Sequence, residues 1–412
     1  MGSKMSKMIT FIPKIRFKDY LNDWPYTELK EVKDVRDGTH SSPKYVDNGY
    51  PLVTSKNLTD SGLNLDDVSL ISELDYNEIN KRSKVEVGDI LLGLIGTIGK
   101  PVLVETEGFA IKNVGLIKNG GQIQNQFLLQ YLKTNLFNKY IQIEMAGNTQ
   151  KFLGLETLRN TKVPVPSPEE QSAIGFLFRN LDDLLASYKD NLANYQSLKA
   201  TMLFKMFPKA GQTVPEIRLD GFEGEWEKGT IGEFGSFYYG KSAPKWSVTD
   251  EATTPCVRYG ELYTKFSTKI DEIYSYTSIP KENLKLSSGN EVLVPRVGED
   301  PLDFANCSWL SLKGVAIGEM ISVYNTPNNP LFIAYYFNAK MKKEFAKRVE
   351  GGSVANLYYT YLENISISVP SLPEQQAIGA YFSNLDNLIN SYQEKISQLE
   401  ILKKKLLQEM FI

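Results

Sequence analysis

The sequence predicts an α+β protein in which two mixed α/β globular domains and two long helices form an internal repeat. Three observations predict this fold class. The phrase NLDDLLASY at 180–188 returns as NLDNLINSY at 384–392. Both copies stand in an apolar heptad pattern, which indicates a long helix that packs on another helix. The stretch before each copy has short apolar runs broken by glycine turns and then a helical pattern, as expected of a mixed domain.

The composition is that of an ordinary globular chain with room for two or three domains. The 412 residues are 42% hydrophobic and 23% charged, and the formal net charge is −3, so any nucleic-acid-binding face would be a local basic patch. No apolar run is long enough for a membrane span, and we expect a cytoplasmic protein that does not enter a membrane. Cys256 and Cys307 lack metal-ligand spacing and fit a reducing compartment, so neither a metal site nor a disulfide is predicted.

The repeat keeps one offset without a gap. Gly175 and Gly379 are 379 − 175 = 204 positions apart, and the same offset relates VPS at 165–167 to VPS at 369–371. About half of the positions in 165–207 are identical in the second copy. A long ungapped match of this kind indicates one rigid element that is used twice.

Each repeated segment has the pattern of a helix. Pro168 and Pro373 suit a first helical turn, and the acidic residues that follow them suit a helix N-terminus. Steps of seven from Ile174 and Ile378 meet only apolar or aromatic residues. They predict a coiled-coil seam of Ile174, Leu181, Tyr188, Tyr195, Met202, Ile378, Leu385, Tyr392, Leu399 and Leu406. The alternative is two amphipathic helices on separate cores, but their length and likeness favour packing on each other.

Weaker echoes extend the duplication to the whole chain. Trp24 and Trp226 are 226 − 24 = 202 positions apart, and Pro13 and Pro215 repeat at the same offset. We therefore expect a disordered leader at 1–12, a first globular domain at 13–164, a helix at 165–208, a second globular domain at 209–368 and a second helix at 369–412.

The two repeated segments also carry a family resemblance. VPSPEEQSAIGFLFRNLDDLL and VPSLPEQQAIGAYFSNLDNLI resemble the conserved regions of specificity subunits of type I restriction-modification systems. The P-x-I-R openings at 13–16 and 215–218 and the phrase DGTHSSP at 37–43 look like parts of the target-recognition domains of that family. The resemblance covers nearly the whole chain.

The resemblance implies a function and a set of partners. Each globular domain would be a target-recognition domain that reads half of a split double-stranded DNA site. The helices between these domains would form an antiparallel coiled coil that docks two methyltransferase subunits, which restriction (motor-endonuclease) subunits then join. S-adenosylmethionine, ATP and Mg²⁺ would belong to those partners, and no cofactor would belong to this chain.

The sequence offers no credible catalytic arrangement. His40 is the only histidine, which leaves one possible base for a nucleophilic triad. The glycine-rich stretch at 93–101 fails as a phosphate loop because Leu94 and Pro101 stand where that motif needs glycine and a hydroxyl. We therefore predict a non-catalytic subunit. The competing hypotheses are a coiled-coil scaffold whose heads bind proteins or glycans, and an enzyme with an unfamiliar site.

In the first domain we favour the DGTHSSP loop and nearby basic residues as the DNA-binding surface, because short polar groups suit base edges and cations suit phosphates. The candidates are Thr39, His40, Ser41, Ser42, Lys44, Lys56, Lys81, Arg82, Lys84, Asn148 and Gln150. Structural alternatives remain open. The loop could be a plain surface turn, the basic cluster at 81–84 a solvated turn, and the polar residues at 147–151 helix caps.

In the second domain the stretch YYGKS at 238–242 takes the place of the DGTH loop. Aromatic residues between cations suit contact with both backbone and bases, although the tyrosines could equally be core. Arginines are the residues that most often pair with guanine, and two of them are candidates here. The full candidate set is Tyr239, Lys241, Lys245, Trp246, Arg258, Arg296, Ser353 and Asn356.

Overall fold

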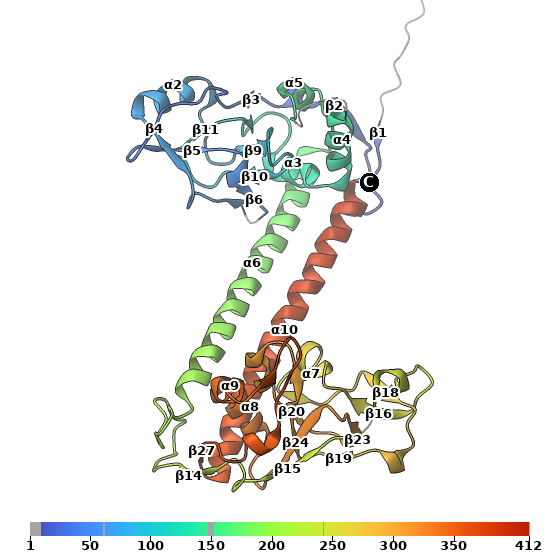
Figure 1. Ribbon diagram of the computed structural model, residues 1–412. Helices are drawn as coiled ribbons and strands as arrows, with labels where there is room; N and C mark the ends of the chain where they lie inside the picture. The colour runs from blue at the N-terminus through green and yellow to red at the C-terminus, as the bar shows by residue number, and fades with distance from the viewer. Residues whose placement is uncertain (1–9, 61, 147–151, 242, 412) are drawn as a thin grey trace, which may run out of the picture. The chain divides into compact units, whose positions relative to one another are not determined.

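The chain divides into two compact units, and each unit contains parts of both long helices. The structure, a computed structural model, describes residues 10–60, 62–146, 152–241 and 243–411. Unit 1 comprises Met1–Lys189 and Glu394–Ile412, and unit 2 comprises Asp190–Gln393. We call their globular parts head 1 and head 2. The long helices are α6 (Pro168–Lys205) and α10 (Leu372–Phe411), as predicted (Figure 1).

Head 1 is a mixed domain of small sheets and short helices. Its central sheet has the order β10 (Pro101–Leu103), β9 (Ile90–Gly93), β12 (Val114–Ile117), β3 (Val35–Asp37), with antiparallel neighbours throughout. A second sheet has the order β11 (Ala110–Ile111), β5 (Tyr50–Val53), β8 (Ser69–Ile71), β4 (Tyr45–Val46). Smaller sheets join β1 (Thr10–Phe11), β2 (Trp24–Glu28) and β13 (Lys162–Pro164), and β6 (Leu58–Thr59) with β7 (Gly62–Leu63). The helices are α1 (Leu29–Val32), α2 (Glu73–Ser83), α3 (Asn125–Leu132), α4 (Asn135–Met145), α5 (Leu155–Arg159) and the 3₁₀ turn η1 (Ser55–Asn57).

Head 2 repeats the central part of this plan with a larger sheet. The main sheet has the order β15 (Ser236–Tyr239), β24 (Ile321–Asn325), β20 (Glu291–Pro295), β22 (Ser308–Leu310), β17 (Lys269–Ile270). The second has the order β18 (Ser275–Thr277), β16 (Thr254–Val257), β23 (Lys313–Ile317), β19 (Leu286–Ser288). Smaller sheets join β21 (Val297–Gly298), β26 (Ala355–Asn356) and β25 (Glu350–Gly351), and β14 (Glu227–Thr230) with β27 (Ser366–Val369). The helices are α7 (Glu261–Thr264), α8 (Pro330–Lys340), α9 (Lys342–Ala346) and the 3₁₀ turns η2 (Lys245–Ser247), η3 (Lys281–Asn283), η4 (Pro301–Ala305) and η5 (Tyr359–Tyr361).

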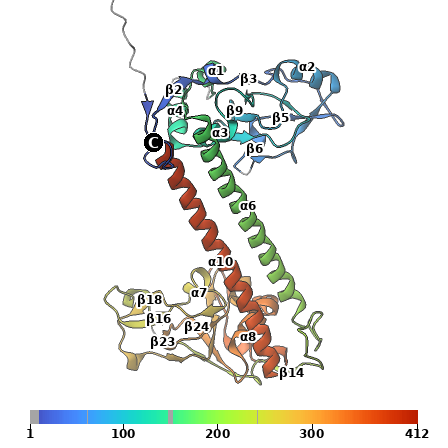
Figure 2. The same ribbon diagram turned by 180° about the vertical axis from the view of Figure 1, so that it is seen from behind.

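Within each unit the two long helices lie side by side and run antiparallel (Figures 1 and 2). In unit 1, Asp182 forms an ion pair with Lys403, and Lys189 reaches Glu400 at 2.7 Å, so numbers rise along α6 as they fall along α10. In unit 2, Lys199 forms an ion pair with Asp386, and a tyrosine ring of each helix packs on the other. The antiparallel direction that the family resemblance implies is thus confirmed in both units.

Each head holds the start of one long helix through an arginine–glutamate pair. In head 1, Arg16 donates to both carboxylate oxygens of Glu170, at 2.6 and 2.7 Å. In head 2, Arg218 donates to both oxygens of Glu374, at 2.8 and 2.7 Å. Bidentate pairs of this kind fix orientation as well as distance. The glutamates stand 374 − 170 = 204 positions apart and the arginines 218 − 16 = 202, so the repeat encodes the same anchor twice.

Each head also holds the end of the other long helix. Met410 and Phe411, at the end of α10, are buried in the core of head 1, which includes Trp24. Met206 and Phe207, just after α6, are buried in the core of head 2. Matching backbone bonds run from the Ile15 amide to the Glu409 carbonyl (3.1 Å) and from the Ile217 amide to the Lys205 carbonyl (3.0 Å). Head 1 is therefore completed by the end of α10, which is distant in sequence, and head 2 by the end of α6, which directly precedes it.

The predicted seam residues are divided between heads and helices. Ile174 and Leu181 are buried in the core of head 1, and Leu399 and Leu406 pack against that core. In unit 2, the seam residues Ile378 and Leu385 are buried in the core of head 2, and Tyr195 and Met202 pack against it. The central tyrosines of the seam, Tyr188, Tyr195 and Tyr392, are half-buried. The two alternatives posed by the sequence thus both apply, because the helices pack on the heads near their starts and on each other between them.

Of the predicted leader at 1–12, residues 1–9 lie outside the described residues, whereas Thr10 and Phe11 pair with β2. Among the described residues, no helix is both long and apolar enough to cross a membrane.

The anchoring tryptophans differ between the heads, which gives a matched pair of variants. Trp24 Nε1 donates to Glu170 at 2.9 Å, whereas the buried Trp226 Nε1 has no acceptor among the described residues. Hydrogen bonds to charged groups contribute about 1.5–3 kcal/mol. We therefore expect Trp24→Phe to lower the free energy of unfolding of head 1 by about 1.5–3 kcal/mol more than Trp226→Phe lowers that of head 2. Hydrogen exchange resolved by head measures both, and equal losses would contradict the assignment.

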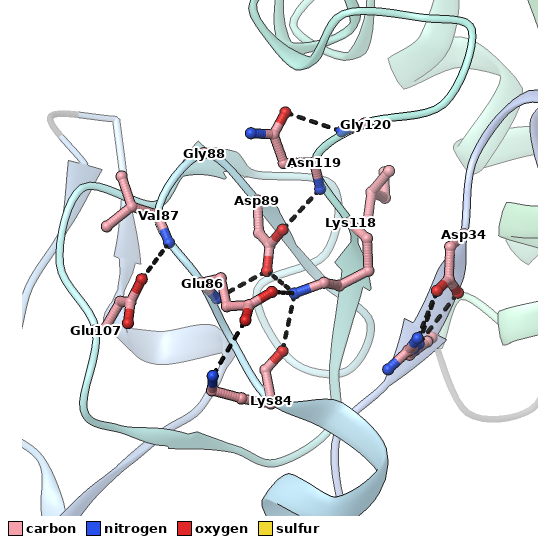
Figure 3. Close-up of polar contacts among 12 residues, drawn as sticks. Asp34, Lys84, Glu86, Val87, Gly88, Asp89, Glu107, Lys118, Asn119 and Gly120 are labelled. Atoms are coloured by element: carbon pink, nitrogen blue, oxygen red, sulfur yellow. Dashed lines mark hydrogen bonds and ion pairs between the residues drawn. The ribbon is translucent and has the colours of Figure 1, made fainter.

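A buried carboxylate orders the turn before β9 (Figure 3). Asp89 accepts hydrogen bonds from the backbone amides of Glu86 (2.8 Å) and Asn119 (2.7 Å) and forms an ion pair with Lys118 at 2.6 Å. In head 2, Glu291 orders the turn before β20, because its carboxylate accepts hydrogen bonds from the amides of the three preceding residues. These donors compensate a buried charge for its lost hydration.

Lys33 is also buried in head 1, and it makes the stability of that head depend on pH. Its ammonium donates to the carbonyls of Gly120 and Ile123. Burial lowers the pKa of Lys33 from 10.5 to about 8, although the Asp89 carboxylate opposes this shift. Between those two pKa values the unfolded chain binds a proton that the folded chain has released, so the free energy of unfolding rises with pH.

We expect this rise between about pH 8 and 10.5, at up to about 1.4 kcal/mol per unit of pKa shift, and we expect it to disappear in Lys33→Met. Denaturant titrations of both proteins across this range measure the effect. Taking the difference between the proteins removes the contribution of tyrosines and thiols that titrate in the same range. Parallel pH profiles would show that Lys33 is not the responsible group.

Candidate nucleic-acid interface

In head 1 the DGTH loop is clamped against the turn between β11 and β12. The Gly38 amide donates to the Val114 carbonyl at 2.9 Å, and the Thr39 amide donates to the Ile111 carbonyl at 3.0 Å. A Cβ atom at Gly38 would lie 2.3 Å from the Ile111 carbonyl oxygen, so only glycine fits there. The side chains that follow Gly38 are therefore presented from a fixed backbone.

Asp37 contacts both this loop and α2, a helix that lies more than thirty residues further along the sequence. Its buried carboxylate accepts from His40 Nε2 at 2.8 Å and forms an ion pair with Arg82 from the last turn of α2. The other ring nitrogen of His40 lies 2.9 Å from Asn113 Oδ1, and Asn113 has the left-handed φ of 54° that asparagine tolerates. Since His40 and Arg82 are both mostly exposed, one buried carboxylate holds two outward-facing donors together.

The other candidates of head 1 lie around this cluster or apart from it. Thr39 Oγ1 accepts from the Ser41 amide, and Ser42 Oγ accepts from Lys112 at 2.7 Å, while Lys44 is exposed near the loop in sequence. Of the predicted 81–84 clamp, only Arg82 joins the loop. The remaining basic candidates, Lys56, Lys81 and Lys84, pair with Asp67, Glu78 and Glu86 at 3.5, 2.5 and 3.1 Å. Asn148 and Gln150 lie outside the described residues.

Sequence reasoning missed Asp37, Lys112 and Asn113 as parts of this cluster. Lys112 and Asn113 belong to a turn between two buried strands, and their approach to the loop follows from a parallel bridge between Thr39 and Lys112. A lysine and an asparagine at a turn were the only local signal, and such residues are common at turns.

In head 2 the YYGKS stretch occupies the place of the DGTH loop. The Gly240 amide donates to the Ile321 carbonyl at 3.0 Å, and the Lys241 amide donates to the Ile317 carbonyl at 2.9 Å, as Gly38 and Thr39 do with their own partners. A Cβ atom at Gly240 would lie 2.1 Å from the carbonyl oxygen of Gly318. The backbone clamp is repeated while the side chains differ, with Tyr239 standing where head 1 has Asp37.

Three predicted residues of head 2 converge beside this loop. Arg296 follows β20, and its guanidinium carbon lies 4.4 Å from the ring centroid of Tyr239. Asn356 pairs with Val297, the residue after Arg296. Tyr358, which the sequence analysis did not select, places its ring centroid 5.4 Å from the same guanidinium carbon. Burial raises the pKa of Tyr239 while Arg296 opposes the shift, so the tyrosine stays neutral near pH 7.

The remaining candidates of head 2 are spread over the neighbouring surface. Arg258 follows Val257, which pairs with Ile317, the residue that binds the amide of Lys241. Lys241 and Lys245 are exposed, and Trp246 is 75% exposed. Ser353 is exposed in the turn between β25 and β26.

The described residues also bear on metal binding and on thiol chemistry. Among them, no three histidines, cysteines or acids gather in a way that could hold a metal ion. Cys256 and Cys307 are free and buried, and burial raises the pKa of both thiols, that of Cys256 to about 11. Neither is a reactive thiolate at neutral pH. What the two heads present is fixed loops that carry donors, cations and aromatic rings.

Comparison with known families gives a match to both halves of the chain. The model of the type I restriction modification DNA specificity domain matches residues 22–194 and again residues 223–401. A putative type I restriction enzyme specificity subunit, MjaX, from Methanocaldococcus jannaschii is 24% identical over 410 residues, covering 93% of this chain and 92% of its own length. The specificity subunit of the Escherichia coli type I restriction enzyme EcoBI is 26% identical over 201 residues, covering 45% of this chain and 41% of its own length.

Solved structures share the fold. The crystal structure of the S subunit of a type I restriction-modification system from M. genitalium matches with a TM-score of 0.60 at 15% identity, covering 98% of this chain and 99% of that one. A chain from a structural study of complex assembly and conformational transition of the type I system matches with a TM-score of 0.51 at 17% identity, covering 95% and 98%.

Proposed function

The chain belongs to the type I restriction modification DNA specificity family, and on this premise we propose that its two heads each read one half of a split double-stranded DNA site. The observation that carries this proposal is the pair of clamped loops. Gly38 and Gly240 fix the same backbone in the two heads, while the side chains around them differ in kind. A repeated support with different contact groups suits the recognition of two different sequences by one protein.

The two surfaces offer different contacts to DNA. Head 1 presents His40 and Arg82 from the buried Asp37, with Lys112 beside Ser42. Head 2 presents Arg296 between tyrosines. Arginine, histidine and short polar side chains donate to base edges, whereas exposed lysines neutralise phosphates without selecting a sequence. We assign base contacts to the clamped loops and phosphate contacts to the lysines around them.

The duplicated helices are the part that docks partner subunits. Leu184 on α6 is 39% exposed, and Leu388 on α10, 388 − 184 = 204 positions further, is 41% exposed. The same apolar side chain is thus offered once in each unit, which suits two copies of one methyltransferase subunit, with restriction subunits joining that complex. S-adenosylmethionine, ATP and Mg²⁺ would act in those partners, and this chain would work as a non-catalytic subunit in the cytoplasm.

Variants in one head at a time test this assignment. In the complex with methyltransferase subunits, Arg82→Ala is expected to relax or abolish recognition of one half-site, and Arg296→Ala of the other half-site only. Base-resolution mapping of methylated DNA measures both. Lys139→Ala on α4 and Lys343→Ala on α9, exposed lysines of each head away from the loops, serve as controls.

An unaltered complex that protects no split sequence would instead favour a scaffold whose heads bind proteins or glycans. A variant of one head that changed both half-sites would also contradict the assignment of one half-site to each head.

A further inference from the structure

Arg296 is a half-buried cation for which the described residues of the protein provide no acceptor. Its Nε atom is fully buried and makes no hydrogen bond, and no carboxylate or carbonyl of a described residue binds its other guanidinium nitrogens. Most other arginines of the two heads have such partners. Arg16 and Arg218 bind glutamates, Arg82 binds an aspartate, and Arg159 binds a carbonyl. The buried Nε is closed to a ligand, whereas the two terminal nitrogens are not buried and are the donors that a ligand can reach. A charge that is partly removed from water gains from a ligand that replaces its missing hydration.

Two aromatic rings lie against this guanidinium. Its carbon lies 4.4 Å from the ring centroid of Tyr239 and 5.4 Å from that of Tyr358, both within the range of a cation–π contact. Behind Tyr239, the ring of Tyr359 packs at 4.6 Å and in turn stacks on Phe237 at 5.4 Å with an interplanar angle of 5°. The arginine is therefore held against a packed aromatic cluster, unlike the exposed lysines near it.

The backbone of Arg296 is fixed as well. Its amide donates to the Met320 carbonyl at 3.2 Å, and its carbonyl accepts from the Leu357 amide at 2.8 Å. A guanidinium is planar and can donate two parallel hydrogen bonds, so it suits ligands that offer two acceptors in one plane. In duplex DNA the major-groove edge of guanine does so with O6 and N7, whereas a phosphate can be bound from many directions.

We propose that Arg296 is the residue by which head 2 recognises one guanine of its half-site, through the O6 and N7 atoms, and that Tyr239 and Tyr358 are its positioning residues. This inference rests on the proposed function, since it specifies the base and the contact at a DNA-reading site. It also selects Arg296 over Arg258 as the guanine reader and adds Tyr358, which the sequence patterns had not singled out.

The residue of head 1 that is equivalent to Arg296 cannot make this contact. Leu153 donates to the Leu94 carbonyl at 2.8 Å, as Leu357 does to the Arg296 carbonyl, and Ile95 bridges Phe152 as Val297 pairs with Asn356. Leu94 and Arg296 are thus structurally equivalent, and Leu94 is buried. The guanine contact therefore belongs to head 2 and to one half of the site.

The test combines protein variants with altered bases in the full complex with methyltransferase subunits. Each guanine of the half-site read by head 2 is replaced in turn by 7-deazaguanine, which lacks the N7 acceptor. At one position we expect this change to weaken binding of the unaltered protein by about 2- to 12-fold, because it removes one of the two hydrogen bonds of a contact that contributes about 1–3 kcal/mol in total. The same change should have no further effect on Arg296→Ala, because the partner of N7 is already gone.

The tyrosine clamp has its own matched pair of variants. Tyr358→Phe keeps the ring and should behave like the unaltered protein, whereas Tyr358→Leu removes the ring and should lose discrimination at the same guanine. Arg348→Ala, at an arginine that pairs with Glu344 on α9, is the control for loss of a positive charge in head 2. Thermal unfolding of each variant separates a folding defect from a recognition defect.

Three results would overturn the inference. Arg296→Ala could weaken binding to all sequences equally, which is the behaviour of a phosphate contact. The half-site of head 2 could contain no G·C pair. Tyr358→Leu could leave discrimination intact while Arg296→Ala removes it, and the clamp would then have no role. If the unaltered complex bound no split site at all, the proposed function itself would fall, and that outcome is visible before any variant is made.

Discussion

A chain truncated after Lys209 is expected to form a two-fold homodimer, because it is not stable as a monomer. Head 1 is incomplete without Met410 and Phe411, which close its core around Trp24. In the truncated chain the equivalent residues at the same offset, Met206 and Phe207, would be left exposed by the absence of head 2. A second copy can place them in the vacant core of head 1, since the repeat supplies the same residue types.

The ion pairs between the helices support this exchange. Asp182 pairs with Lys403 in unit 1, and Asp386 pairs with Lys199 in unit 2. Because 386 − 182 and 403 − 199 both equal 204, the two ion pairs occupy equivalent positions of the repeat. Two copies of α6 placed antiparallel would therefore pair Asp182 of each copy with Lys199 of the other.

Light scattering tests the assembly, and methylation mapping with methyltransferase subunits tests the specificity. We expect a dimer that directs methylation to an interrupted palindrome built from the half-site of head 1 alone. A stable monomer, or a dimer that still directs methylation to the original asymmetric site, would contradict the proposed exchange.

The second large effect is a loss of stability in the head that buries each of two equivalent phenylalanines at the helix ends. Phe411→Ala is expected to destabilise head 1, from which it is distant in sequence, by about 3–5 kcal/mol, the usual cost of removing a buried phenylalanine. Phe207→Ala should destabilise head 2 by a similar amount. Phe411 and Phe207 are both fully buried, and each packs with the tryptophan and α3 or α8 aromatic residues of its head.

Hydrogen exchange followed by peptide mapping assigns the loss to a head. Phe176→Ala on α6 is the control, because that side chain is 66% exposed and should change either head by less than about 0.5 kcal/mol. Loss of protection in head 2 on mutating Phe411 would mean that the end of α10 does not complete head 1.

The long helices and the repeat could be predicted from sequence because their signal is local and periodic. Heptad spacing and a constant offset are visible without knowledge of the fold. What the repeat could not show is which head receives which helix end, because Met206–Phe207 and Met410–Phe411 are identical in sequence. The heptad pattern also could not show that some seam residues pack into the heads, as Ile174 and Ile378 do. That burial depends on domain interiors whose strands are only two to five residues long.

At the candidate site, sequence identified loops but not the clusters that they form. The DGTH loop and YYGKS could be matched by position, and their glycines share a backbone clamp. The approach of Arg82 to Asp37, and of Tyr358 to Arg296, joins residues 45 and 62 positions apart, since 82 − 37 = 45 and 358 − 296 = 62. Such approaches follow from the packing of α2 on head 1 and from the pairing of β21 with β26 in head 2, which a single sequence does not reveal.

A strand-resolved methylation map tests most directly whether this chain specifies a split DNA site. The map is made for DNA from a host that carries this chain with methyltransferase subunits, before and after the chain is deleted. We predict one bipartite methylated sequence, with two short specific parts separated by a spacer of unspecified bases. It should disappear on deletion and return when the chain is restored. A methylation pattern that is unchanged by the deletion, or a methylated sequence in one uninterrupted part, would contradict it.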